Sequence, residues 1–316
     1  MPPFREFVPQ GVIPACLLPF HDDLSVDEAE YRRHLLDVAA VPGLAALTIN
    51  AHASEVAACS LEEQRRVLDL TMEAVGDRLP VVHGVYADGS APAARIARQA
   101  QHGGASSLLV FPSYVLSAGG HLRPEMALAH VKTIAEASDL PLILFQYPAH
   151  TGVQYPLDTL LRLADEVPTV RAIKDWCNDP MLHERHIRVL QGLPRPVHVL
   201  TTHSSWLMSS LVLGCKGLLS GAGSVIAGFQ AALWNAIESQ DLKTAQALNE
   251  RIYPLAQAFY AAPFLDMHNR MKEVLVMQGR LSRAVVRPPL VKLGAAELAR
   301  LREAAQRAGL PLPKAA

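Results

Sequence analysis

The sequence has little charge imbalance, few aromatic residues and no long apolar stretch. Its 316 residues include 29 Lys and Arg against 30 Asp and Glu, and only 6% are aromatic. A net charge of −1 excludes binding to nucleic acid through a general basic excess. No apolar run reaches the roughly eighteen residues of a membrane span. The 50% hydrophobic content excludes a disordered chain.

Cysteines are also scarce and widely spaced, at Cys16, Cys59, Cys177 and Cys215. Without a Cys-x-x-Cys pair, neither a zinc knuckle nor a disulfide framework is expected. The N-terminal residues lack the pattern of a signal peptide, and the first ten are predicted to form an extended arm. We therefore expect a cytoplasmic protein.

Short apolar runs alternate with longer amphipathic stretches along most of the chain. The runs predicted as strands are 11–18, 44–50, 80–84, 107–111, 141–145, 170–174, 197–200 and 217–220. Helices are predicted over 25–40, from Ser60, and over 88–101, 124–137, 157–164, 182–190, 205–213 and 226–238. Ser25 is the expected cap of the first helix, and Ser60 with Glu63 forms a capping box.

This order of elements favours a (β/α)8 TIM barrel, because continuously apolar strands are buried on both faces and therefore parallel. A doubly wound open sheet is the alternative, but its Gly-x-Gly-x-x-Gly turn is missing after the first strand. Strand patterns stop near Asp241, and helices are predicted over 242–258, 264–278 and 295–308. We expect residues 1–240 to form the barrel that carries the active site. Residues 241–316 are expected to form a helical extension packed on it.

Reactive groups of such barrels lie at the carboxyl ends of the strands. Lys174 is a lone amine at the end of an apolar strand. Burial should lower its pKa, and a free amine in the barrel mouth can form a Schiff base with a ketone. From position alone, the alternative is a lysine that reaches water or pairs with Asp175.

Several motifs resemble the dihydrodipicolinate synthase/N-acetylneuraminate lyase family of pyruvate-type class I aldolases. They are 11–15 with Pro19-Phe20, Ser54-Glu55, 111–114, 140–148 with Thr151-Gly152, 172–175, 214–217 with Ser220, and 286–290. The resemblance implies that Lys174 is the Schiff-base lysine and that no cofactor or metal is needed. It also implies a homotetramer built as a dimer of dimers, in which Tyr114 resembles a tyrosine lent to a neighbouring site.

The loop after the second strand departs from the family. Where the family has Gly-(Thr/Ser)-Thr-Gly-Glu, this chain has Ala51-His52-Ala53-Ser54-Glu55. The backbone amides of His52 and Ala53 can still bind a carboxylate, but a hydroxyl relay cannot pass through Ala53. Ser54 or the imidazole of His52 is the expected replacement. Glu55 is either a structural acceptor for loop amides or an acid of the site, and the family suggests the former.

The fifth strand departs as well. Phe145 holds the place of the family's catalytic tyrosine, and Tyr147 follows two residues later on the same face of the strand. We predict that Tyr147 moves protons; the alternative is a wall residue. His150 replaces an arginine that binds a second carboxylate in the synthases of the lysine pathway, which disfavours their reaction.

Other polar and apolar residues complete the expected site and its surroundings. Thr202 and His203 follow the seventh strand, where they suit a polar substrate tail, and Ser220 ends the eighth. His183 and His186 have helical i, i+3 spacing, which we interpret as a surface pair in preference to a metal site. The Met and Trp residues are interpreted as core.

The sequence therefore predicts a Schiff-base aldolase, lyase or dehydratase acting on a 2-keto acid. Its substrates would be pyruvate plus an aldehyde, or a 2-keto-3-deoxy sugar acid. Dihydrodipicolinate synthase proper, and a barrel that binds a keto acid without turnover, are the alternatives; a metal-dependent aldolase is a weaker third. No nucleic-acid or membrane partner is expected.

Overall fold

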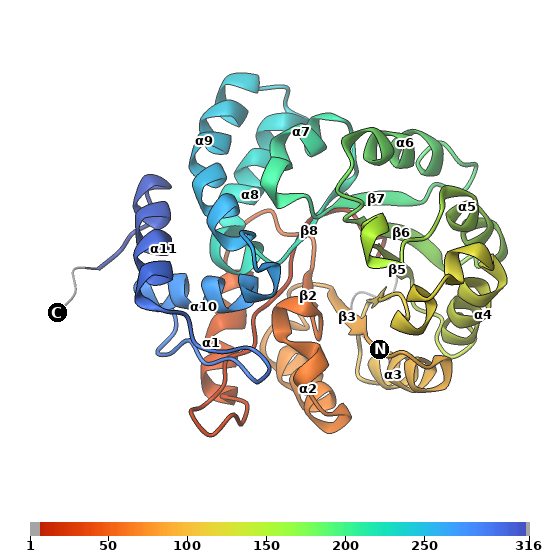
Figure 1. The fold of residues 1–316 in the computed structure, drawn as a ribbon, viewed down its shortest axis with the longest axis horizontal. Coiled ribbons are helices and arrows are strands. Elements are labelled where there is room, and N and C mark those ends of the chain that lie inside the picture. Colours follow the sequence, from red (N-terminus) through yellow and green to blue (C-terminus); the bar gives the residue numbers. More distant parts are fainter. Residues whose placement is uncertain (1–6, 314–316) are drawn as a thin grey trace.

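Eight parallel strands form a closed barrel at the centre of the computed structural model, which describes residues 7–313 (Figure 1). The strands are β1 (Gly11–Pro14), β2 (Leu47–Ile49), β3 (Val81–Val85), β4 (Ser107–Val110), β5 (Leu142–Gln146), β6 (Val170–Asp175), β7 (His198–Thr201) and β8 (Gly217–Ser220). They are hydrogen-bonded in the order β1-β8-β7-β6-β5-β4-β3-β2. Ala15 pairs with Thr48 and closes the barrel between β1 and β2. The predicted TIM barrel is confirmed, and the open sheet is wrong.

The first strand is shorter than its apolar run, which was predicted to extend to Leu18. The ladder with β8 ends at Pro14 because the chain then changes partners. The backbone N–H of Ala15 still donates to Ser220 (3.0 Å), whereas that of Cys16 donates to Thr48 on the other side (2.8 Å). Cys16, Leu17 and Leu18 remain fully buried. The apolar run therefore identifies which residues are buried, but the strand covers only the first part of that run.

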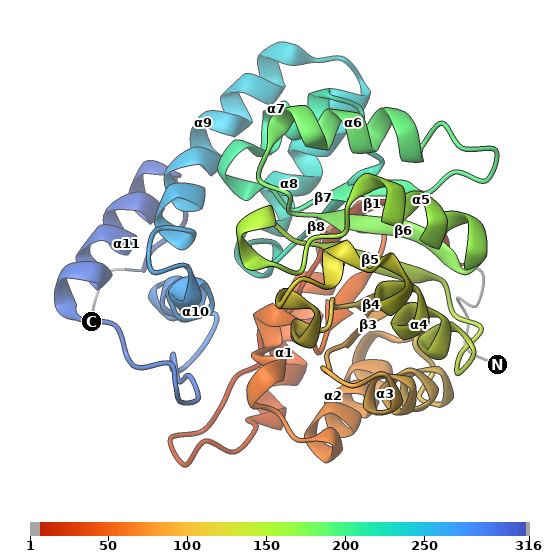
Figure 2. The same ribbon diagram turned by 45° about the vertical axis from the view of Figure 1, so that its right-hand side comes forward.

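Helices surround the barrel on the outside (Figures 1 and 2). They are α1 (Glu28–Ala39), α2 (Leu61–Val75), α3 (Ser90–His102), α4 (Pro124–Ala135), α5 (Leu157–Glu166), α6 (Pro180–Leu190), α7 (Leu207–Val212) and α8 (Gly223–Glu238). The Ser60–Glu63 capping box is confirmed. Ser25 is not the cap of α1: Asp27 accepts the hydrogen bond from Glu30 (3.0 Å), and the Ser25 hydroxyl donates to Asp23 (2.6 Å).

The predicted helices after the barrel are confirmed as α9 (Leu242–Phe259), α10 (Met267–Met277) and α11 (Ala295–Arg307). Residues 264–266 form a separate short 3-10 turn. α9 packs along α8, and α10 lies against the loop that follows β2. Residues 1–6 of the predicted N-terminal arm lie outside the described residues, and 7–10 form neither helix nor strand.

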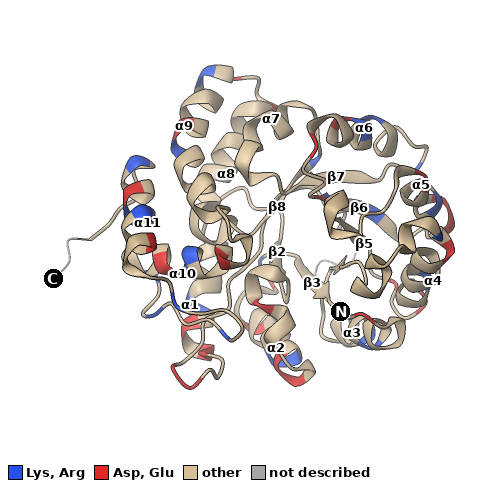
Figure 3. Cartoon of the chain, viewed as in Figure 1, with Lys and Arg blue, Asp and Glu red and all other residues tan. Residues whose placement is uncertain are grey.

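Charged residues lie mainly on the outer helices, while the centre of the barrel is largely uncharged (Figure 3). Positive and negative side chains are interspersed on these outer helices, in agreement with the nearly equal numbers of basic and acidic residues in the sequence. Within residues 7–313, no helix has the length and apolar character needed to cross a membrane.

Candidate active site

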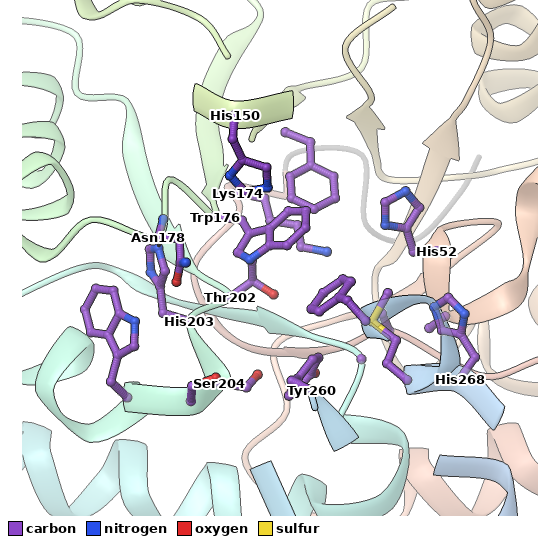
Figure 4. Close-up of a pocket in the computed structure, with 18 residues that line it drawn as sticks. His52, His150, Lys174, Trp176, Asn178, Thr202, His203, Ser204, Tyr260 and His268 are labelled. Carbon is purple, nitrogen blue, oxygen red and sulfur yellow. Dashed lines mark hydrogen bonds between the residues drawn. The ribbon is translucent and has the colours of Figure 1, made fainter. Parts of the chain in front are cut away.

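A cavity of about 410 Å³ opens at the carboxyl ends of the strands, where the sequence placed the reactive groups. Figure 4 shows its labelled side chains turned toward one shared space. Its lining comprises Ala15, His52, Ala53, Phe145, His150, Lys174, Trp176, Asn178, Thr202, His203, Ser204, Ser205, Trp206, Gly221, Tyr260, Phe264, Met267 and His268. The strand ends and the segment from α9 to α10 thus share one site.

Lys174 is the buried amine of this cavity. It is 5% exposed, and its Nζ lies 4.0 Å from the centre of the Phe145 ring, on the neighbouring strand. Burial lowers the pKa of Lys174 from 10.5 to about 7. This desolvation outweighs the attraction between ammonium and ring. A large fraction of the amine is therefore uncharged near neutral pH and available as a nucleophile.

Asp175 does not pair with Lys174, because successive residues of a strand point to opposite faces. Its carboxylate faces the outer helices, where Oδ2 accepts hydrogen bonds from Nδ1 of His183 (2.9 Å) and of His186 (2.8 Å). Burial alone would raise the pKa of Asp175, but these hydrogen bonds hold it well below its usual range. The interpretation of His183 and His186 as surface residues is wrong: both are 0% exposed.

Tyr147 lies behind Phe145, with the two ring centres 4.5 Å apart. Its hydroxyl is 2.9 Å from Nε2 of His52. Burial raises the pKa of Tyr147 well above 10, and burial with the nearby Lys174 lowers the pKa of His52 well below 6.5. Both groups are thus neutral near pH 7. His52 lines the cavity and Tyr147 does not, so the phenol of Tyr147 is connected to the cavity through its contact with the imidazole of His52.

The loop after β2 holds His52 and Ala53 in a short 3-10 turn (His52–Ser54). In the described part of the chain, neither backbone N–H of these two residues has an acceptor. Ser54 turns away from the cavity, since its hydroxyl donates to the carbonyl of Cys16 (2.8 Å). The hydroxyl expected as a possible relay is therefore engaged in holding the loop to the chain after β1.

Glu55 anchors the same loop to the C-terminal segment. It has a left-handed backbone (φ 53°), and its carboxylate accepts hydrogen bonds from Nζ of Lys272 (2.5 Å) and the backbone N–H of Arg287 (2.9 Å). Lys272 is fully buried and also donates to the carbonyl of Val285 (2.7 Å). Glu55 is thus a structural acceptor, although its partners come from α10 and the segment after it.

Thr202 and His203 line the opposite wall, as expected for residues after β7. Nε2 of His203 accepts a hydrogen bond from the backbone N–H of Asn178 (3.1 Å), so Nδ1 carries the proton and donates to Thr201 (3.1 Å). Burial lowers the pKa of His203 to about 3. This imidazole is therefore a neutral part of the wall.

Asp175, Cys177 and His203 also stand close enough to ligate a metal. Their ligand atoms are engaged otherwise: Oδ1 of Asp175 accepts from the backbone N–H of Cys177 (2.9 Å), and burial raises the pKa of the Cys177 thiol. His203 uses Nε2 for Asn178. The three residues form a hydrogen-bonded cluster that supports the wall of the cavity.

The remaining predicted site residues occupy different positions. His150 is exposed and lines the cavity. Tyr114, 40% exposed, is outside the lining with its ring centre 6.2 Å from that of Tyr147. Ser220 is buried, with its hydroxyl 3.2 Å from that of Ser204. The structure thus gathers most of the predicted residues around Lys174, some of them in supporting positions.

Sequence reasoning missed much of the aromatic wall. Trp176, Trp206 and Met267, interpreted as core, line the cavity, which corrects that interpretation. Tyr260, Phe264 and His268 were missed because they come from the C-terminal segment, whose return to the barrel mouth leaves no local pattern. For Trp176, a signal was present: it follows Lys174 by two residues, just after a strand end.

A closed parallel barrel with a buried, partly uncharged lysine at the carboxyl ends of its strands defines a class I aldolase, which works through a Schiff base. Residues 8–308 match the model of the dihydrodipicolinate synthetase family. The chain therefore belongs to that family, and the resemblance seen in its motifs is confirmed.

Named relatives agree with this assignment. The 4-hydroxy-tetrahydrodipicolinate synthase of Salinibacter ruber is 30% identical over 253 residues, covering 79% of this chain and 80% of that protein. The enzyme of the same name from Syntrophus aciditrophicus is 28% identical over 304 residues, covering 95% and 99%.

Solved structures share the fold over nearly the whole chain. One, described as the first monomeric dihydrodipicolinate synthase variant, superposes with a TM-score of 0.88 at 23% identity and covers 98% of this chain and 99% of that one. YagE, a prophage protein of the dihydrodipicolinic acid synthase family from E. coli K12 in complex with pyruvate, gives 0.87 at 23% identity, with 96% and 99% covered.

Proposed function

We propose that this class I aldolase joins pyruvate to an aldehyde, with Lys174 as the nucleophile. The observation that carries the proposal is the buried amine of Lys174, whose pKa is about 7, in a cavity that His52 also lines. The Nζ lone pair attacks the keto carbon and a C–N bond forms. The keto oxygen leaves as water, and the product is an iminium that withdraws electrons from the neighbouring methyl group.

His52 then takes a proton from that methyl group, and the C–H electron pair becomes the enamine double bond. The imidazole is neutral near pH 7, as proton abstraction requires. Tyr147, 2.9 Å behind it, exchanges protons with Nε2 and orients the ring. This pair takes the place of the family tyrosine and the hydroxyl relay. The sequence offered Tyr147 and His52 as alternatives; in the proposed mechanism they act together.

The enamine carbon attacks the aldehyde carbon, a C–C bond forms, and the aldehyde oxygen recovers the proton from His52. Water hydrolyses the iminium and releases a 4-hydroxy-2-keto acid with the free lysine. The free backbone N–H groups of His52 and Ala53 would hold the carboxylate of pyruvate throughout. The exposed His150, where lysine-pathway synthases have an arginine, supports an aldehyde other than theirs.

Dehydration of a 2-keto-3-deoxy sugar acid is a second candidate, favoured by the hydroxyls of Thr202, Ser204 and Ser205 on one wall. The iminium and the proton transfer to His52 would be the same, but a hydroxyl would leave as water in place of C–C bond formation. Product analysis by mass spectrometry separates the two, because only dehydration lowers the mass of a single substrate by one water.

Reduction with borohydride tests the shared first step. With pyruvate present, we expect a reduced pyruvyl adduct in the wild type and none in Lys174→Ala. An exposed lysine variant, Lys243→Ala, serves as the control that keeps the adduct. Absence of an adduct from the wild type with pyruvate and with other 2-keto acids would refute the proposed function.

We also propose that the chain assembles as a homotetramer in the cytoplasm. Tyr114 supports the assembly, since it is half-exposed beside Tyr147, where a neighbouring subunit could receive it. The four cysteines are free, as expected in a reducing compartment. Sedimentation equilibrium would measure the assembly state, and a monomeric mass would refute the tetramer.

A further inference from the structure

The lining of the cavity has little charge, which restricts the second substrate. Among the described residues, Lys174 is the only Lys, Arg, Asp or Glu that lines it. Burial keeps the imidazoles of His52, His203 and His268 neutral near pH 7 by lowering their pKa values, to about 3 for the last two. A charged group on the second substrate would lose hydration without gaining a counter-charge from the lining, which is unfavourable.

The same cavity has stacked rings on two of its sides. Trp176, after β6, stacks on Phe264 with ring centres 4.8 Å apart and planes 17° apart, and Phe264 stacks on Tyr260 at 5.8 Å and 29°. On the other side, Trp206 stacks on His203 at 4.2 Å and 27°. Trp176, Trp206, Tyr260 and Phe264 are only partly buried by the protein, so they present apolar surface to a ligand, whereas His203 is buried. Flat faces of this kind favour a planar, apolar guest.

Polar groups at this wall are neutral as well. His268 is nine-tenths buried, and its Nε2 has no hydrogen-bond partner in the described part of the chain. Figure 4 shows its ring on the same side of the cavity as His52. A buried imidazole nitrogen without a partner is unfavourable, and an uncharged hydroxyl or carbonyl on a ligand would provide that partner.

We infer that the second substrate is an uncharged aromatic aldehyde; this inference rests on the proposed aldol reaction. Its ring lies along Trp176 and Phe264, and its carbonyl carbon meets the enamine formed on Lys174. The C–C bond forms between the two carbons, and the carbonyl electron pair moves to oxygen, which takes a proton from His52. A carboxylate or ammonium group on the aldehyde is disfavoured, because Lys174, which is bonded to pyruvate in the enamine, is the only Lys, Arg, Asp or Glu of the described lining.

Three aldehydes test this inference with pyruvate in excess: benzaldehyde, 4-carboxybenzaldehyde and glyceraldehyde. We expect kcat/KM for benzaldehyde to exceed that for each of the others by at least about tenfold, the ratio given by 1.4 kcal/mol. Trp176→Leu should lower kcat/KM for benzaldehyde about tenfold. Ser205→Arg adds a cation to the exposed rim of the cavity and should shift the preference toward 4-carboxybenzaldehyde.

The outcomes distinguish this inference from the function on which it rests. If the wild type forms the pyruvate adduct but prefers 4-carboxybenzaldehyde or glyceraldehyde, or turns over none of the three, the aromatic assignment is wrong and the Schiff-base function stands. If no adduct forms, the proposed function fails and the inference with it. Because Ser205→Arg seeks a gained activity at an exposed position, a misfolded variant cannot imitate its expected result.

Discussion

Replacing Lys174 with Met should stabilise the protein, and by an amount that depends on pH. The native state lowers the pKa of Lys174 from 10.5 to about 7 by burial. That difference corresponds to about 5 kcal/mol of unfavourable free energy when the amine is charged in both states. Methionine fills a similar volume and carries no charge, so its contact with the Phe145 ring is retained without the desolvation.

The pH dependence follows from which state binds more protons. Below pH 7 the native and unfolded states both carry the charged amine, and the full destabilisation is present. Between pH 7 and 10.5 the unfolded state binds more protons, so wild-type stability rises with pH relative to Lys174→Met. We expect the difference in free energy of unfolding to fall from about 5 kcal/mol at pH 6 to about 2 kcal/mol at pH 9.

Urea unfolding followed by circular dichroism at the two pH values measures this difference. Titratable groups that do not interact with Lys174 contribute equally to both proteins and cancel in the comparison. Lys243→Met, at an exposed position of α9, is the matched control and should show a small difference at both pH values. If the difference in free energy of unfolding between wild type and Lys174→Met stays constant from pH 6 to pH 9, the amine keeps an ordinary pKa in the native state. That result would refute the lowered pKa of Lys174 and the stabilisation expected from it.

Three further substitutions have expected outcomes. Tyr147→Phe removes the hydroxyl that contacts His52. Deuterium exchange into the methyl group of pyruvate, measured by NMR, should therefore slow by about 10²–10⁴-fold, while the borohydride adduct persists. An unchanged exchange rate would make Tyr147 a wall residue. Lys272→Met leaves the buried carboxylate of Glu55 without a cationic partner. This variant should lower the free energy of unfolding in urea by about 3–5 kcal/mol, with partial recovery when Glu55→Gln is added. Gly84→Ala places a Cβ 1.8 Å from the carbonyl oxygen of Asn50. We expect the free energy of unfolding, measured by thermal unfolding, to fall by about 3 kcal/mol or more. A variant as stable as the wild type would contradict the close approach of Gly84 to Asn50.

The barrel was predictable because each of its strands is a separate apolar run bounded by turn residues. The ends of its helices and strands were less predictable. Ser25 and Asp27 are both good capping residues two positions apart, and only the tertiary path of the chain selects Asp27. Cys16 to Leu18 are as apolar as a strand, but they lie where the chain changes its hydrogen-bond partner from β8 to β2.

The position of Lys174 was predictable for a different reason. The carboxyl end of a strand in a parallel barrel has a known location, so Lys174 could be placed in the barrel mouth before any contact was known. His183 and His186 show where this reasoning stops. Their spacing places them on one face of α6, but nothing local says that this face meets the outward-pointing Asp175. Helical spacing identifies which residues share a face, while the partner of that face depends on packing.

The segment after the barrel contributes to the candidate site in two ways. α10 brings Met267 and His268 to the cavity lining. One turn later, Lys272 binds Glu55 at the end of the 3-10 turn that contributes His52 and Ala53 to the same lining. A barrel ending at β8 would have Lys174 in place but lack one wall, and the loop that we propose to bind the carboxylate would lose its anchor. The proposed nucleophile therefore belongs to the barrel, whereas the proposed selection of the second substrate depends on helices that no strand pattern identifies.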